Sequence, residues 1–116
     1  MDYKDKQIAV LGCGASGEAA ALRLLGEGAM VRVLDTAQPG RLGERAANLR
    51  RHGVRILAGA EALADDSHYD RAIISPGIPR GAPLAERILA RRIEMVGELE
   101  FAFELCRCPV LAITGT

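Results

Sequence analysis

The chain has 116 residues, 49% of them apolar and 26% charged, with 15 Lys and Arg balanced by 15 Asp and Glu. These values are typical of one folded domain and exclude an intrinsically disordered protein. Zero net charge argues against a protein that binds nucleic acid through its phosphates. An aromatic content of 3% without any Trp also argues against a surface on which bases stack.

Cysteine content and the N-terminal residues indicate the cellular compartment. Three cysteines are too few for a disulfide-based fold. Residues 1–6 are polar, so they do not form the apolar region of a signal peptide. No apolar run approaches the roughly 18 residues that a membrane-spanning helix needs. We therefore expect a reduced, cytoplasmic protein that does not insert into a membrane.

Strands and helices alternate in the pattern of apolar residues along the chain. Short apolar runs predict strands, and positions spaced three or four apart predict helices, the first of them capped by Ser16. In chain order the predicted elements are strand Gln7–Leu11, helix Ser16–Glu27, strand Met30–Leu34, helix Arg41–His52, strand Val54–Leu57, one helical turn within Ala60–His68, strand Arg71–Ile74, helix Pro83–Arg92, strand Glu94–Val96, helix Glu98–Cys106 and strand Pro109–Thr114.

This alternation is typical of the α/β class. It predicts a Rossmann-like, doubly wound parallel sheet of about five strands with helices on both faces. If the strand order is 3-2-1-4-5, the first and fourth strands are neighbours at the topological switch point. Ligands of such sheets bind at that point, beyond the carboxyl ends of the strands.

A glycine-rich turn, Gly12–Gly17, has the spacing G-x-G-x-x-G, follows the first strand and opens the first helix. Gly12 permits a tight turn, Gly14 lets a diphosphate approach the backbone, and Gly17 lets helix and strand pack closely. The free N–H groups and the dipole at the helix start favour a diphosphate there. A tight strand-to-helix turn without a ligand is the alternative interpretation.

Two further loops are predicted to lie beside this turn. Asp35 and Thr36 end the second strand, and Ser75–Gly77 follows the fourth. Together the three loops suit a nucleoside diphosphate, in which Asp35 would face a ribose, as in NAD enzymes, or a base. The alternatives are a solvated acid at Asp35 and an ordinary Pro-Gly turn at Ser75–Gly77.

No complete set of catalytic residues is present. Cys13 has no neighbouring base in the sequence and is expected to be a small buried residue. His52 and His68 are expected to be solvated, and the cysteines at 106 and 108 lack a second pair of metal ligands. Three acidic residues are expected to form the solvated face of the last helix: Glu98, Glu100 and Glu104. We expect no catalytic residue and no metal site in this chain.

Five segments together resemble the N-terminal part of the Mur ligase family, and most closely its D-glutamate-adding type. They are Val10–Gly17, Val33–Thr36, Ile73–Ile78, Val96–Glu100 and Ala112–Thr116. The resemblance implies that residues 1–108 form a UDP-substrate-binding domain. It also implies that residues 109–116 are the first strand and the truncated start of an ATP-binding central domain.

The resemblance also implies a role for individual residues. The diphosphate would lie at Gly14, Ala15, Ser16 and Gly17, the uracil at Asp35 and Thr36, and the diphosphate and sugar region at Ser75, Pro76 and Gly77. The ATP loop would begin at Thr114, Gly115 and Thr116, and the chain stops before the lysine of that loop. Ala37 stands where the family often has arginine, so a charge or stacking contact to the uracil is absent there or comes from elsewhere.

The function implied is that of an ATP- and Mg²⁺-dependent ligase of peptidoglycan synthesis. Such a ligase joins D-glutamate to UDP-N-acetylmuramoyl-L-alanine through an acyl phosphate. The fragment would bind neither ATP nor Mg²⁺ and would be inactive alone. Residue patterns without the resemblance leave two alternatives open, an NAD-binding domain of a dehydrogenase and a nucleotide-sensing regulatory module.

Overall fold

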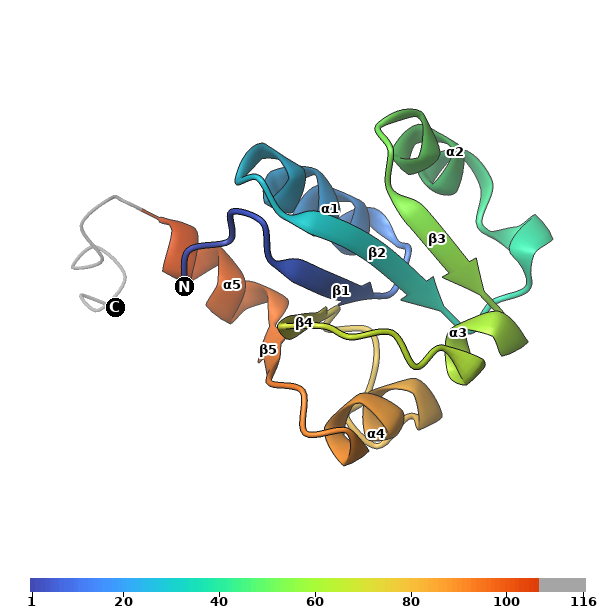
Figure 1. Ribbon diagram of the computed structural model, residues 1–116. Helices are drawn as coiled ribbons and strands as arrows, with labels where there is room; N and C mark the ends of the chain where they lie inside the picture. The colour runs from blue at the N-terminus through green and yellow to red at the C-terminus, as the bar shows by residue number, and fades with distance from the viewer. Residues whose placement is uncertain (107–116) are drawn as a thin grey trace, which may run out of the picture.

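Five short strands pair in parallel to form one sheet in the order β3-β2-β1-β4-β5. The computed structural model describes residues 1–106 (Figure 1). The strands are β1 (Gln7–Leu11), β2 (Met30–Asp35), β3 (Arg55–Ala58), β4 (Arg71–Ile74) and β5 (Met95–Gly97). The helices are α1 (Ala15–Gly26), the 3-10 turn η1 (Pro39–Arg41), α2 (Gly43–Arg51), α3 (Ala60–Ala64), α4 (Pro83–Ala90) and α5 (Glu98–Leu105).

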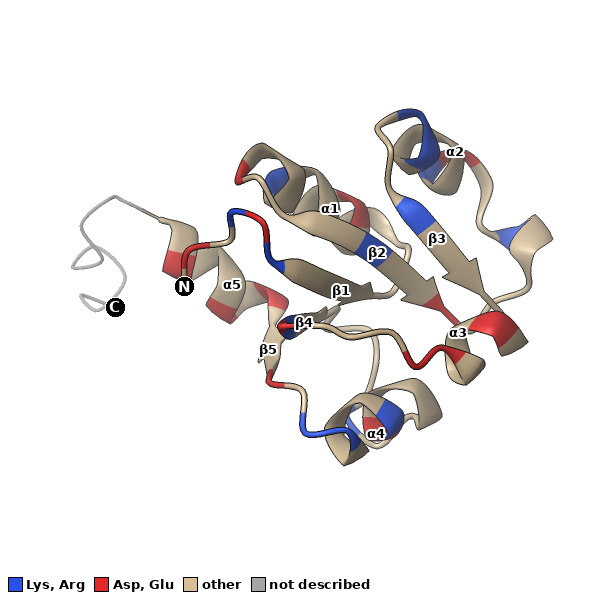
Figure 2. Ribbon diagram, viewed as in Figure 1, with Lys and Arg blue, Asp and Glu red and all other residues tan. Residues whose placement is uncertain are grey.

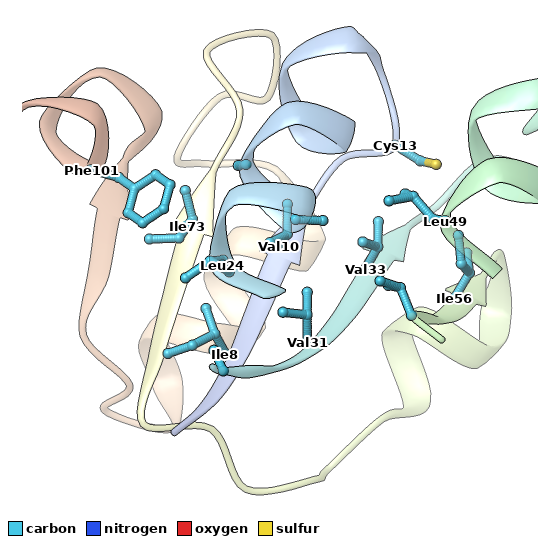
Figure 3. Packing of buried hydrophobic residues seen from close by; sticks show 14 of the residues in the cluster. Ile8, Val10, Cys13, Leu24, Val31, Val33, Leu49, Ile56, Ile73 and Phe101 are labelled. Atoms are coloured by element: carbon cyan, nitrogen blue, oxygen red, sulfur yellow. The ribbon is translucent and has the colours of Figure 1, made fainter. Parts of the chain in front are cut away.

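Successive side chains of each strand point to opposite faces of the sheet, so each face has its own core. In β1, Ile8 and Val10 belong to one buried cluster, and Ala9 and Leu11 belong to the other. Helices α1, α2 and α5 cover the first face, part of which is shown in Figure 3. Helices α3 and α4 cover the second face. The predicted doubly wound sheet, its strand order and its two helical layers are confirmed.

Two predicted helical segments differ in extent because of local backbone geometry, and several other predicted bounds differ by one or two residues. The helix expected over Arg41–His52 is divided into the turn η1 and the helix α2, which starts at Gly43 with φ of +65°. The helical turn within Ala60–His68 is α3, which ends after Ala64, where the backbone becomes extended. The predicted strand Pro109–Thr114 lies outside the described residues.

The predicted cap of α1 is wrong. The helix begins one residue earlier, and its N-cap is Gly14, in an extended conformation and without a side-chain hydrogen bond. Ser16 therefore lies within the first turn, where its hydroxyl is 3.0 Å from the hydroxyl of Ser75. Serine is a common N-cap residue, but here Gly14 occupies the N-cap position. The Ser16 hydroxyl instead contacts Ser75, which lies on another loop.

A buried arginine on β4 fastens α5 and the N-terminal segment to the sheet. Arg71 is only 8% exposed. Its guanidinium donates hydrogen bonds to the Tyr3 hydroxyl at 2.8 Å and to Glu104 Oε2 at 2.7 Å. It also donates to Glu94 Oε1 at 2.8 Å. Glu104 is exposed, as predicted, but its carboxylate also pairs with Arg71, a cation on β4 that the local sequence of α5 does not reveal.

These contacts alter the ionisation of the acidic partner. Burial raises the pKa of the Glu104 carboxyl, but hydrogen bonds from Tyr3 and Arg71 and the charge of Arg71 outweigh burial and hold the pKa below its usual value. Burial and the bond to Glu104 raise the pKa of Tyr3 to about 12. The tyrosine therefore remains a proton donor, and the carboxylate remains charged, at neutral pH.

We predict that Arg71→Met destabilises the domain by about 2 kcal/mol, because it removes the charge-assisted hydrogen bonds to Tyr3, Glu94 and Glu104. The matched variant Arg23→Met removes an arginine whose side chain is 55% exposed and pairs with Glu27 on the surface of α1. It should cost less than about 0.5 kcal/mol. Urea unfolding of both variants measures the difference, and equal costs would contradict the role given to Arg71.

We also predict a pH-dependent effect of Glu104→Gln. A carboxyl whose pKa is lowered on folding stabilises the protein above its unfolded pKa, and this contribution is lost as the pH falls through the folded pKa. Because Glu104 is partly screened by solvent, Glu104→Gln should cost about 1 kcal/mol at pH 7. The difference from wild type should shrink as the pH falls below about 4.3. Urea unfolding at several pH values tests this, and a pH-independent difference would contradict it.

Candidate functional site

The three loops predicted to meet at the switch point line one cavity of about 370 Å³. The cavity lies at the carboxyl ends of β2, β1 and β4. Its polar side is formed by Gly12, Cys13, Gly14, Asp35, Thr36, Ser75 and Gly77. The predicted convergence of these loops is therefore confirmed as a matter of position, whereas their binding roles stay predictions.

The glycines of the turn differ in what surrounds them. Gly12 has φ of +106°, which favours glycine, and its N–H donates to the Leu34 carbonyl at 2.8 Å. A Cβ at Gly17 would lie 1.9 Å from the carbonyl oxygen of Gly12, so no side chain fits there. A Cβ at Gly14 would meet no atom within 4 Å. The predicted tight turn and close helix packing are confirmed, and Gly14 faces open space.

The start of α1 supplies hydrogen-bond donors at this cavity. The first N–H groups of a helix have no acceptor within the helix, and the helix dipole makes this end positive. No side chain caps α1, and Gly14 and Ala15 are exposed. These features suit an anionic group. Gly17, by contrast, is buried against Gly12, and Ser16 is half-buried against Ser75.

Asp35 is tied to the backbone of two loops. Its Oδ2 accepts a hydrogen bond from the Cys13 N–H at 2.8 Å, and its Oδ1 accepts one from the Ala37 N–H at 2.8 Å. The interpretation of Asp35 as a solvated acid is therefore wrong. Each carboxylate oxygen already accepts one backbone bond and keeps a second lone pair. The sequence places an acid at this point but does not reveal its partners.

Ser75 joins the third loop to the first. Its carbonyl accepts a hydrogen bond from the Ile78 N–H at 3.0 Å, which closes the predicted turn. Its N–H donates to the Leu11 carbonyl at 3.2 Å, and its hydroxyl is 3.0 Å from that of Ser16. The loops that follow β1 and β4 are thereby held together. Pro76 is exposed and does not belong to the residues that line the cavity.

Sequence reasoning missed the apolar side of the cavity. This side is formed by Ile78, Pro79, Ala82, Pro83 and Leu84. Ile78 lies over the glycine turn, since a Cβ at Gly12 would be 3.0 Å from its Cδ1. The signal in the sequence was the high share of apolar residues over 78–84, in a loop that leaves a strand at the switch point, although exposed loops are usually polar.

The remaining candidates show no arrangement for catalysis. Cys13 is buried, and burial followed by the nearby charge of Asp35 raises the pKa of its thiol, which confirms a packing residue. His52 and His68 are exposed, as predicted. Among residues 1–106, no helix is long and apolar enough to span a membrane. The predicted ATP-loop residues Thr114, Gly115 and Thr116 lie outside the described residues.

Curated relatives match the chain along nearly its whole length. It is 35% identical over 116 residues to the UDP-N-acetylmuramoylalanine–D-glutamate ligase of Desulfatibacillum aliphaticivorans, covering 100% of this chain and 26% of that protein. The ligase of the same name from Symbiobacterium thermophilum is 35% identical over 111 residues, covering 96% of this chain and 24% of that protein. The chain thus spans about a quarter of the length of these relatives. No family model matches it.

A solved structure supports the fold. The UDP-N-acetylmuramate–alanine ligase of Thermotoga maritima superposes with a TM-score of 0.72 at 22% identity, covering 85% of this chain and 22% of that protein. At this identity the likeness concerns the fold alone. The sequence relatives nevertheless confirm the resemblance to Mur ligases. Over nearly its whole length, the chain is homologous to about a quarter of the UDP-N-acetylmuramoylalanine–D-glutamate ligases of this family.

Proposed function

We propose that the chain is the N-terminal, substrate-binding domain of an ATP-dependent ligase that adds D-glutamate to UDP-N-acetylmuramoyl-L-alanine in peptidoglycan synthesis, in the cytoplasm. The observation that carries this proposal is the cavity of about 370 Å³ at which the loops after β1, β2 and β4 converge. Its position and its mixture of backbone donors with an apolar wall suit a nucleotide-linked sugar.

Within this proposal the diphosphate lies at the N-terminus of α1. No Lys or Arg is among the cavity-lining residues that the structure describes, so backbone N–H groups from Gly14 onward supply the donors. Ala15 and Ser16 belong to the same helical turn, and Gly17 packs that turn against the backbone of Gly12. A binding site of this kind needs no basic patch, in keeping with a net charge of zero.

The uracil would lie toward the end of β2. Thr36 is exposed at the cavity, and the carboxylate oxygens of Asp35 keep further lone pairs beside those that accept the backbone bonds. Ala37, at the position where the family often has arginine, donates its N–H to Asp35 and packs its side chain against the core. Base recognition would therefore depend on Asp35 and Thr36 without a cation at position 37. Ser75, Pro76 and Gly77 would line the diphosphate and sugar region.

The complete ligase would use ATP and Mg²⁺, whose loop would begin at Thr114, Gly115 and Thr116. These groups supply activation of the substrate carboxylate, and this chain contains no residue proposed to catalyse that step. The chain's own contribution is binding energy far from the reacting carboxylate. Such energy orients the substrate for reaction with D-glutamate in the rest of the enzyme.

Calorimetric titration tests the ligand, and Gly14→Val tests where it binds. Wild type should bind UDP-N-acetylmuramoyl-L-alanine and not NAD. Gly14→Val should weaken binding at least tenfold, because its side chain would project into the open space at the diphosphate position. The matched control is Gly26→Val, at the other end of α1 and also without neighbours. Binding of NAD alone would refute the ligase proposal, and unchanged affinity in Gly14→Val would refute the placement.

Asp35→Ala should reduce both stability and affinity. It leaves the buried Cys13 N–H and the Ala37 N–H without acceptors, at a cost of about 2 kcal/mol, and it releases the glycine turn. Asp66→Ala, which removes an exposed carboxylate, is the control and should change neither quantity. Thermal unfolding and the same titration measure the two effects. Weaker binding at full stability would show that Asp35 contacts the ligand without positioning the turn.

A further inference from the structure

A second cavity of about 370 Å³ lies between α1 and α5, on the sheet face that those helices cover. Its walls are mostly apolar, with Ala19 and Ala20 on α1 and Phe101, Ala102 and Leu105 on α5. We call this cavity the α1–α5 groove. It is separate from the proposed nucleotide site, with which it shares no lining residue.

The outer surface of α5 beside the groove is also apolar. Leu99 is 71% exposed and Phe103 is 40% exposed. These residues are one helical turn apart and therefore lie on the same side of the helix. Ala102 is exposed there as well, so α5 carries exposed apolar side chains beside the groove.

One polar group within the groove lacks a partner. Glu98 Oε2 is buried, and no residue in the described part of the chain donates a hydrogen bond to it. A buried carboxylate oxygen without a donor is costly. An occupant that brings a hydrogen-bond donor as well as apolar side chains would satisfy this oxygen and cover the apolar walls.

We infer that the α1–α5 groove is the docking surface for the part of the ligase polypeptide that this chain does not contain. This inference rests on the proposed function. The relatives are about four times as long as the chain, so about three quarters of their length has no counterpart in it. The docked segment presents apolar side chains to Ala102 and Leu105, and a Lys, Arg or N–H donor to Glu98.

Charge argues against a second copy of this chain as the occupant. All charged residues of α5 are acidic, namely Glu98, Glu100 and Glu104, as Figure 2 shows. A symmetric dimer through α5 would place like charges against each other. Arg23, the one cationic residue among the groove-lining residues that the structure describes, already pairs with Glu27 at 3.5 Å and is therefore not a spare donor for Glu98. A different polypeptide surface with a cationic group satisfies both requirements.

Cysteine labelling tests the inference directly. Ala102→Cys places a thiol in the groove, and Ala90→Cys places one at an exposed position of α4, as the matched control. Both variants carry Cys106→Ser and Cys108→Ser, and Cys13 is buried. The rate of reaction with a maleimide is measured in the 116-residue chain and in the full-length ligase, with the labelled position identified by peptide mass.

We expect position 102 to react at least ten times more slowly in the full-length ligase than in the chain alone, while position 90 reacts equally in both. Equal rates at position 102 would overturn the inference. Slow labelling in the chain alone that accelerates on dilution would also overturn it, in favour of a second copy. The ligase activity of the full-length protein is assayed separately, so failure of the proposed function is distinguishable from failure of docking.

Discussion

The close approach between α1 and the end of β1 is the constraint on which the candidate site depends. With Gly17 packed against the Gly12 carbonyl, the helix starts immediately beyond the strand, and even a methyl group would force them apart. This approach places the N-terminus of α1 at the carboxyl edge of the sheet. A helix whose first turn lay farther from the strand would direct its free N–H groups away from the neighbouring loops. Packing of one backbone against another therefore determines where an anion could be held.

Other contacts fix the neighbouring loops relative to that turn. Asp35 connects the turn to the end of β2, and the hydroxyl pair Ser16–Ser75 connects α1 to the loop after β4. The Gly59 N–H donates to the Asp35 carbonyl at 2.9 Å, so the loop after β3 joins the same set. Contacts within the chain thus hold these loops in place, which reduces the entropy lost when a ligand binds. The polar groups that define its shape are in part the groups proposed to contact the ligand.

Features that depend on residues close together in the sequence could be predicted, and contacts between residues far apart in the sequence could not. The strand order, the two helical layers and the meeting of three loops depend on local apolar patterns combined with general rules for parallel sheets. Partners distant in sequence could not be predicted: Arg71 meets Glu104 and Tyr3 only because β4 lies beside α5 and the N-terminal segment. The same limit hid the donors to Asp35. The apolar wall at Ile78 could not be predicted either, because the order of residues in a loop does not show which side chains face the cavity.

The electrostatics of the cavity indicate how a ligand would be selected. Asp35 is the one ionised side chain among the lining residues that the structure describes, and two backbone donors already stabilise its charge. Attraction for an anion therefore comes from the first turn of α1, and this effect fades within about one turn of the helix. Such a site exerts little long-range attraction, in contrast to a basic patch. Discrimination among nucleotides then depends on contact: on Thr36 and Asp35 at one end, and on how well the apolar wall from Ile78 to Leu84 fits what is attached to the diphosphate.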